Sequence, residues 1–230
     1  MHAVLIVLLI GQTPRDIARP AVTVSNAVMI PAEGYESLEF QITNNTAQAI
    51  TGYGVQIEVT WTDGKTTREG LGMLGPLDED DPRGGSIAAR AAGWARHPWA
   101  RPGDYPPREV VVTLQWAIFA DGSFVGDPAG VKDAFASRER QYRQEVFVLK
   151  ALRAAQQAGT GLEALRAALR NVEEAPEEMK AALTYVRGNL QRALNGQVTI
   201  APDVYLFNLI RSAEERRDRF DAHRRPRGGG

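Results

Sequence analysis

The stretch Asp127-Pro128-Ala129-Gly130 separates two different patterns of apolar residues in this chain. Before this stretch, apolar and polar residues alternate, and a period of two is typical of half-buried β-strands. After it, apolar residues recur three, four or seven positions apart, as they do in amphipathic α-helices. The sequence therefore predicts an α+β protein, with an antiparallel β half followed by an all-helical half.

The β half contains strand patterns that end in turn signals. The strongest pattern covers Val110–Phe119, and Val55–Trp61 alternates strictly between apolar and polar residues. Each is followed by an Asp-Gly pair, which favours a tight hairpin because glycine adopts a positive φ without strain. Because no helical pattern separates the strands, we expect an antiparallel sandwich. Further strands are predicted over residues 21–24, 28–30, 38–43 and 66–69.

The helical half contains four amphipathic patterns, each with a single apolar stripe. Such stripes must be buried against one another or against a sheet, so we predict a bundle of about four helices. The patterns cover residues 131–158, 162–172, 176–194 and 202–220. The predicted organisation is a leader and spacer at 1–20, a sandwich at 21–128, a helical region at 129–222 and a disordered tail at 223–230.

The N-terminus carries an uninterrupted apolar run, Ala3–Ile10. Its length is typical of the hydrophobic region of a signal peptide and too short to span a bilayer. No Lys or Arg precedes it. We expect a bacterial protein that is periplasmic or secreted and has no transmembrane span in its mature chain. If the run is not a signal, the protein is cytoplasmic.

Charge and cysteine content exclude several functions. The sequence has no cysteine, which excludes disulfides, thiol nucleophiles and cysteine-ligated metals. The net charge of −1 divides unevenly, with −6 over residues 1–130 and +5 over residues 131–230. Opposite charges favour either docking of the two halves or a basic surface on the helices.

No motif in the chain predicts catalysis or a cofactor. Residues 70–75 match G-x-G-x-x-G, but Pro76 and the acids at 78–81 exclude the helix start that a dinucleotide needs. Those four acids also lack the glycine and glutamate spacing of an EF-hand calcium loop. We therefore predict no catalytic residues, no metal site and no cofactor, and only paired carboxylates remain open as a catalytic possibility.

The segment from Trp94 to Pro107 is the candidate ligand-binding region. It holds two of the four tryptophans among prolines and cations, and we predict an exposed loop at the edge of the sandwich. The alternative is that the tryptophans fold inward and cap the β core. The candidate contact residues are Trp94, Arg96, His97, Trp99, Arg101 and Tyr105.

The β half resembles the immunoglobulin-like modules of bacterial exported proteins. The resemblance covers residues 21–126 and implies a role in adhesion, recognition or structure. The helical half resembles no family. The resemblance rests on Phe40–Asn45, on Val55–Trp61 with the following Asp63-Gly64, on Pro102-Gly103 and on Val110–Phe119.

These observations predict a non-enzymatic exported protein that acts as a binding or scaffolding module in the bacterial cell envelope. Its expected partner is another protein or an envelope component. One alternative is a carbohydrate-binding module that uses Trp94, Trp99 and Tyr105. The other is a cytoplasmic regulatory protein whose basic end, Arg211–Arg227, contacts nucleic acid. Nucleic acid is not expected as the partner of an exported protein.

Overall fold

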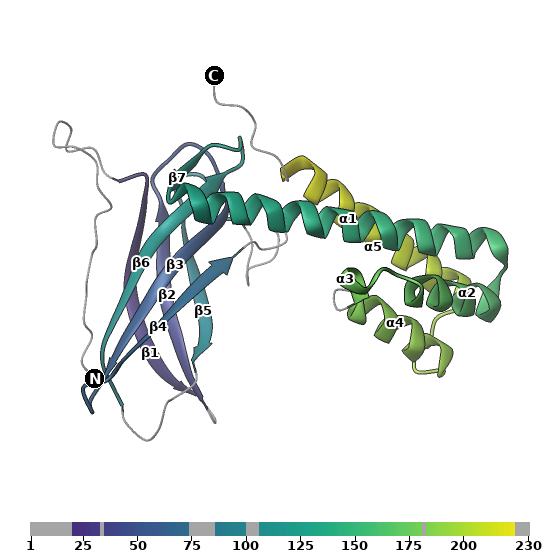
Figure 1. The fold of residues 1–230 in the computed structure, drawn as a ribbon, viewed down its shortest axis with the longest axis horizontal. Coiled ribbons are helices and arrows are strands. Elements are labelled where there is room, and N and C mark those ends of the chain that lie inside the picture. The colour runs from purple at the N-terminus through teal and green to yellow at the C-terminus, as the bar shows by residue number, and fades with distance from the viewer. Residues whose placement is uncertain (1–19, 33–34, 74–85, 100–105, 181–182, 224–230) are drawn as a thin grey trace. The chain divides into compact units, whose positions relative to one another are not determined.

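The structure is a computed structural model that describes residues 20–32, 35–73, 86–99, 106–180 and 183–223. Within these residues, strands precede helices, so the chain is an α+β protein, as the change of period predicts (Figure 1). The strands are β1 (Val22–Ala32), β2 (Tyr35–Asn44), β3 (Ile50–Trp61), β4 (Thr66–Met73), β5 (Ala92–Trp99), β6 (Pro107–Phe119) and β7 (Phe124–Gly126). The helices are α1 (Pro128–Ala158), α2 (Gly161–Glu173), α3 (Glu177–Lys180), α4 (Thr184–Leu194) and α5 (Pro202–His223).

The chain divides into two compact units, and the division falls between Phe135 and Ala136, inside α1. The first unit contains the strands and the first two turns of α1. The second contains the rest of α1 and the other helices. Of the predicted leader and spacer at 1–20, residues 1–19 lie outside the described residues, and so do residues 224–230 of the predicted tail at 223–230, whereas His223 ends α5.

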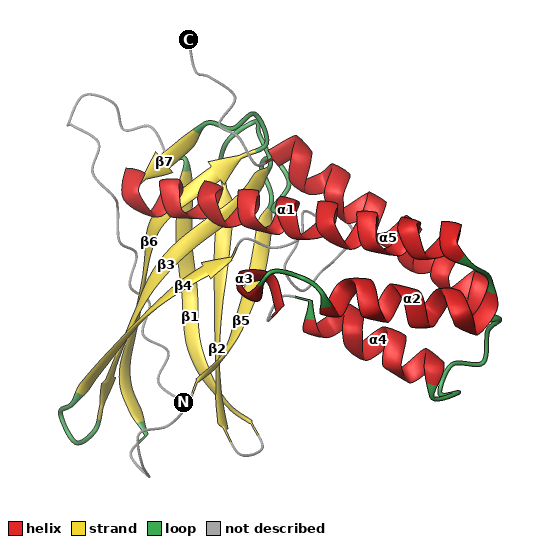
Figure 2. Cartoon of the chain, turned by 45° about the vertical axis from the view of Figure 1, so that its right-hand side comes forward, coloured by secondary structure: helices red, strands yellow, loops and turns green. Residues whose placement is uncertain are grey.

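The seven strands form two antiparallel sheets that share one core. Sheet A has the order β1-β2-β5, and sheet B has the order β4-β3-β6-β7. The chain passes from one sheet to the other after β2, after β4 and after β5, whereas β3–β4 and β6–β7 are hairpins (Figure 2). The inner faces of both sheets contribute to the core, which includes the fully buried residues Leu38, Phe40, Ile42, Ile57, Val59 and Trp61.

The two Asp-Gly hairpins form as the sequence predicts, and both use the same local chemistry. Gly64 and Gly122 each have a φ of +85°, which glycine adopts without strain. Asp121 Oδ1 accepts hydrogen bonds from the Ser123 hydroxyl, at 2.6 Å, and from the Ser123 amide, at 3.0 Å. These bonds stabilise the carboxylate, and they lower the pKa of Asp121. Asp63 accepts the Lys65 amide in the same way, at 3.0 Å.

Asn44 holds the corner where β2 ends and the chain leaves sheet A. It is fully buried, and its amide nitrogen donates to the carbonyls of Gln48, Ile87 and Ala88 at 2.7, 3.2 and 3.0 Å. Its Oδ1 accepts the Thr46 amide at 3.0 Å. One side chain therefore satisfies backbone groups of its own turn and of a segment that lies more than 40 residues after it in the sequence.

The helical part of the first unit begins on the outer face of sheet B. Asp127 caps α1, with Oδ1 accepting the Ala129 amide at 3.1 Å and Oδ2 accepting the Gly130 amide at 3.0 Å. Pro128 occupies the first helical position, where the lack of an N–H is harmless. The predicted change from strands to a helix after Asp127 is therefore confirmed. The residues that start the helix belong to the stretch that separates the two periods.

The indole of Trp116 lies between a glycine of β3 and a glycine of α1. A Cβ added at Gly54 would come within 2.3 Å of its Nε1, and one added at Gly130 within 2.4 Å of its Cδ1. Trp116 also packs in a small cluster with Ile118, Val131 and Ala134. Sheet B is thus apolar on both faces at this end, because the first turns of α1 cover its outer face.

The second unit packs α1, α2, α4 and α5 around one apolar core that includes Leu152, Leu165, Leu190 and Leu206. The third predicted helix, residues 176–194, is instead two helices, α3 and α4, with the buried Leu183 between them in a turn. The sequence does not reveal this break, because the apolar residues keep a helical spacing from one helix to the next.

Polar contacts join α1 to α5 along their length. Arg216 makes two hydrogen bonds to Glu145, at 2.8 and 3.2 Å, and Arg153 pairs with Glu214. Arg138 is 1% exposed and donates to the carbonyl of His223 at 3.1 Å, at the end of α5, where a cation interacts favourably with the helix dipole. Burial lowers the pKa of Arg138 to about 10, so it remains protonated at neutral pH.

Candidate ligand-binding face

The predicted tryptophan loop is a strand over its first half, which corrects the sequence-based expectation. Residues Ala92–Trp99 form β5, which pairs with β2 at the edge of sheet A. Pro98 lies opposite Ser37. A proline has no N–H to donate, so it is tolerated at an edge, where one side of the strand has no ladder. The prolines correctly exclude an inner strand, but they do not exclude an edge strand.

Because β5 is a strand, its side chains alternate between two faces of sheet A. Trp94 and Arg96 lie on the outer face, and His97 and Trp99 lie on the side of the core. Trp94 is 59% exposed, whereas Trp99 is 4% exposed. The four candidates that the structure describes, Trp94, Arg96, His97 and Trp99, therefore do not lie on one face. Arg101 and Tyr105 lie outside the described residues.

The outer face around Trp94 is built by the register of β5 against β2. Trp94 lies opposite Gln41, and Arg96 lies opposite Glu39. The Arg96 guanidinium pairs with the Glu39 carboxylate, and Asn26 Nδ2 donates to Gln41 Oε1 at 3.0 Å. The indole thus stands beside an amide pair and a neutralised ion pair.

β1, at the other edge of sheet A, contributes the outward-facing residues farthest from β5. Val28 and Ile30, each 38% exposed, lie opposite Glu39 and Ser37 in the ladder. A bulge between Ser25 and Val28 shifts the register of β1. The polar residues of β2 consequently separate the apolar residues of β1 from Trp94.

The inward-facing residues His97 and Trp99 of β5 make contacts that stabilise the fold. His97 Nε2 lies 3.2 Å from Glu69 Oε1 of β4, so a polar contact links the edge strands of the two sheets. The His97 ring also meets the Trp99 ring edge-on, with 6.0 Å between centroids. This arrangement supports the alternative that Trp99 caps the core, and it removes His97 from the outer face.

Sequence reasoning missed the polar partners of Trp94, namely Asn26, Glu39 and Gln41. They lie more than 50 residues before β5 in the chain. Their position depends on the β2–β5 register, which no local pattern encodes. The alternation of residues 92–99 was the available signal that Trp94 and Trp99 point to opposite faces.

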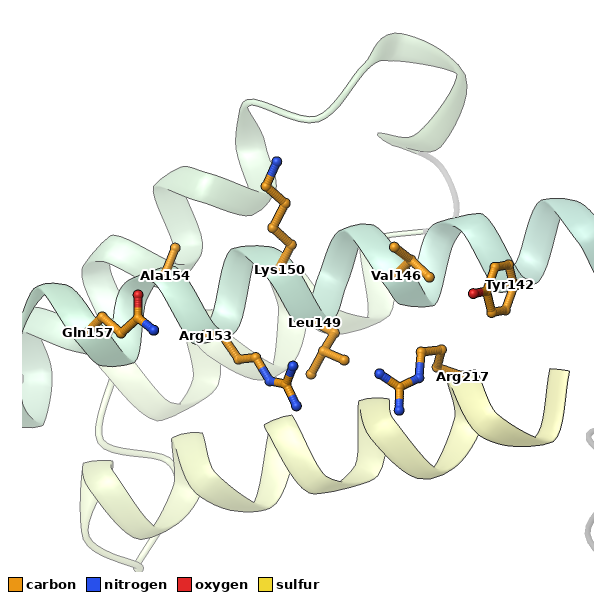
Figure 3. A pocket seen from close by; sticks show the side chains of 8 residues that line it. All are labelled: Tyr142, Val146, Leu149, Lys150, Arg153, Ala154, Gln157 and Arg217. Atoms are coloured by element: carbon orange, nitrogen blue, oxygen red, sulfur yellow. The ribbon is translucent and has the colours of Figure 1, made fainter. Parts of the chain in front are cut away.

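A shallow groove of about 540 Å³ runs along α1 in the second unit (Figure 3). Arg153 and Leu149 point from α1 toward α5, which contributes Arg217, while Lys150 points away from α5. The groove is basic, but Arg153 pairs with Glu214 and Arg217 with Asp218. Arg211 pairs with Glu215, so much of the basic charge at this end is already balanced.

The described part of the chain holds no cluster of His, Asp and Glu with the composition to bind a metal ion. None of the described helices is long and apolar enough to cross a membrane. The acids at 78–81 lie outside the described residues, whereas Gly70–Met73 forms the end of β4 and not the strand-to-helix turn of a dinucleotide site.

Comparisons with known proteins give little further information. No model of a known protein family matches the chain, and no characterised protein sequence matches it either. One similar solved structure is the X-ray structure of a Northeast Structural Genomics Consortium target. It covers 47% of this chain and 88% of its own, at 13% identity and a TM-score of 0.23. A TM-score of this size supports no conclusion about fold or function.

Proposed function

We propose that this chain is a non-enzymatic, exported binding protein of the bacterial cell envelope. Its ligand contacts the outer face of sheet A around Trp94, which we call the Trp94 face: Trp94 and Arg96 of β5, Glu39 and Gln41 of β2, and Asn26 of β1. The apolar run Ala3–Ile10 supports export to the periplasm or beyond.

The exposure of Trp94 is the observation that carries the proposal. A tryptophan that is 59% exposed leaves a large apolar ring in water, although the other three tryptophans of the chain are buried. Tryptophan is also a side chain that contributes strongly to binding, because it offers a large rigid surface with little entropy to lose. A sheet face that holds one such exposed ring suits recognition.

The strand arrangement supports an immunoglobulin-like module. Seven antiparallel strands in two facing sheets, with chain crossings after β2 and β5, are features of that class. It departs from the constant-type arrangement in one respect, because β4 pairs with β3 of sheet B instead of joining sheet A.

The proposal is tested by retention of the purified protein on fractions of the bacterial envelope. We expect one fraction to retain the wild-type chain and the Trp94→Ala variant to be lost from it. Phe124→Ala is the matched control, because Phe124 is 44% exposed but lies on β7, in the other sheet. Equal retention of all three proteins, or retention of none, contradicts the proposal.

Export is tested separately by N-terminal sequencing of the protein recovered from each cell compartment. We expect a mature chain in the periplasm or medium that begins after Ile10. Recovery in the cytoplasm with Met1 or His2 at its start contradicts export.

A further inference from the structure

We infer that the ligand of the Trp94 face is a β-1,4-linked polysaccharide whose pyranose rings stack on the indole of Trp94. This inference rests on the proposed function and names the class of ligand for the same face. Three properties of the face lead to it: its charge, its distribution of polar groups and its shape.

The charge of the face favours a neutral ligand. Along the outward-facing positions of β1, β2 and β5, the charged side chains are Glu39 and Arg96, and they pair with each other. Glu39 is mostly covered, with 19% of its side chain exposed. A strongly anionic or cationic partner would therefore meet no net opposite charge here.

The distribution of polar groups favours hydroxyl-rich ligands over a protein surface. The core of a protein–protein interface is a contiguous apolar patch. Here, Gln41 and Glu39 of β2 separate Trp94 from the exposed Val28 and Ile30. A pyranose ring needs a different arrangement, in which C–H bonds on one side pack on an aromatic ring and hydroxyls at the rim meet polar groups. Outward-facing hydroxyls and amides lie on the β2 and β1 side of the indole: Gln41 and Thr43 on the neighbouring strand, and Thr23, Ser25 and Asn26 on the strand beyond it.

The shape of the face favours a polymer over a free sugar. Neighbouring strands of a sheet lie about 4.8 Å apart, so the three strands of sheet A form a surface about 10 Å wide between their axes. A β-1,4-linked chain is an extended ribbon with C–H bonds on its ring faces, so it suits the exposed face of a sheet. An α-1,4-linked chain coils and does not.

Electrophoresis through gels that contain a soluble polysaccharide tests the inference, together with sedimentation on insoluble polymers. The β-1,4-linked probes are hydroxyethyl cellulose, chitin and purified peptidoglycan, and amylose is the α-1,4-linked control. We expect at least one β-1,4-linked probe to retain the wild-type chain and amylose to leave it unretarded. Trp94→Ala is expected to weaken binding at least tenfold, as loss of a central aromatic contact does.

Two further variants test the assignment of the face. Gln41→Ala removes the amide opposite Trp94 and is expected to weaken binding by about threefold to tenfold, the effect of one or two hydrogen bonds. Phe124→Ala is expected to bind as the wild type does. Unchanged circular dichroism spectra establish that each variant is folded, which is expected because Trp94 is mostly exposed.

The outcomes separate this inference from the proposed function. If no β-1,4-linked probe binds, but envelope protein or lipid still retains the chain through Trp94, the ligand class is wrong and the binding face stands. If no envelope fraction retains the chain through Trp94, both the ligand class and the binding face are wrong. Binding to a β-1,4-linked probe that survives Trp94→Ala also overturns the inference.

Discussion

The substitution Gly130→Ala tests how α1 packs on sheet B. The new methyl carbon would lie 2.4 Å from Cδ1 and 2.5 Å from Nε1 of Trp116, which is far inside ordinary contact. The indole has little room to retreat, because a Cβ at Gly54 of β3 would also meet it at 2.3 Å. The helix or the ring must therefore shift.

The magnitude follows from two opposing effects. Replacing glycine by alanine inside a helix ordinarily stabilises a protein by about 0.5–1 kcal/mol. Overpacking a well-filled site destabilises it by about 1–3 kcal/mol. We expect overpacking to win at Gly130, with a net loss of about 1–2 kcal/mol in the free energy of unfolding.

Gly188→Ala is the matched control, because it is the same substitution in α4 with nothing within 4 Å of the added Cβ. We expect it to stabilise its unit by about 0.5–1 kcal/mol. The second variant Gly130→Ala/Trp116→Phe removes part of the indole and is expected to recover part of the loss caused by the new methyl group, although the shorter ring loses contacts of its own.

Urea unfolding measures both effects, since each unit has its own signal. All four tryptophans lie in the first unit, so tryptophan fluorescence follows the unit that contains Gly130. Circular dichroism at 222 nm follows the helices of the unit that contains Gly188. If Gly130→Ala stabilises its unit as Gly188→Ala does, the first turn of α1 does not lie against Trp116, and this packing is wrong.

Three further predictions concern the core and the helical unit. Asn44→Ala removes a fully buried amide that donates to the carbonyls of Gln48, Ile87 and Ala88 and accepts the Thr46 amide, and it is expected to destabilise the first unit by about 2–3 kcal/mol, measured by urea unfolding. Burial raises the pKa of Tyr53 from 10.0 to about 12, so the unfolded chain ionises first. The stability from this group is complete below pH 10 and is lost between pH 10 and 12, and Tyr53→Phe is expected to show a smaller loss of stability from pH 9 to 11.5 than the wild type. A double-mutant cycle on Glu145 and Arg216 is expected to give a coupling of about 1 kcal/mol that falls with added salt; a coupling near zero contradicts the paired geometry.

The sequence predicts those parts of the fold that depend on local chemistry. The Asp-Gly hairpins and the start of α1 were predictable because each is determined by a few adjacent residues with a specific backbone need. The position of the division between the two compact units was harder to predict from the sequence. It falls after Phe135 because Val131 and Ala134 bury their side chains against Trp116, and such a contact is not encoded by helical period alone.

The candidate site was only partly predictable for the same reason. Trp94 was identified from composition, but its strand was missed because of Pro98. Proline is common in loops, yet it is also tolerated in edge strands. Alternation along a strand places Trp94 and Trp99 on opposite faces, but which of the two is exposed depends on which face of β5 packs on the core, and that required the fold. Asn26, Glu39 and Gln41 carry no signal of their own, since polar residues face outward on most half-buried strands.

Acrylamide quenching of tryptophan fluorescence tests the role of the Trp94 face most directly. Trp94 is 59% exposed, and Trp61, Trp99 and Trp116 are 0, 4 and 8% exposed, so the readily quenched fluorescence reports Trp94. If the ligand covers Trp94, binding of a solubilised envelope fraction reduces quenching of the wild type to the level of the unbound Trp94→Ala variant. Unchanged quenching in protein that is demonstrably bound contradicts a role for the Trp94 face, because the ligand then contacts another surface.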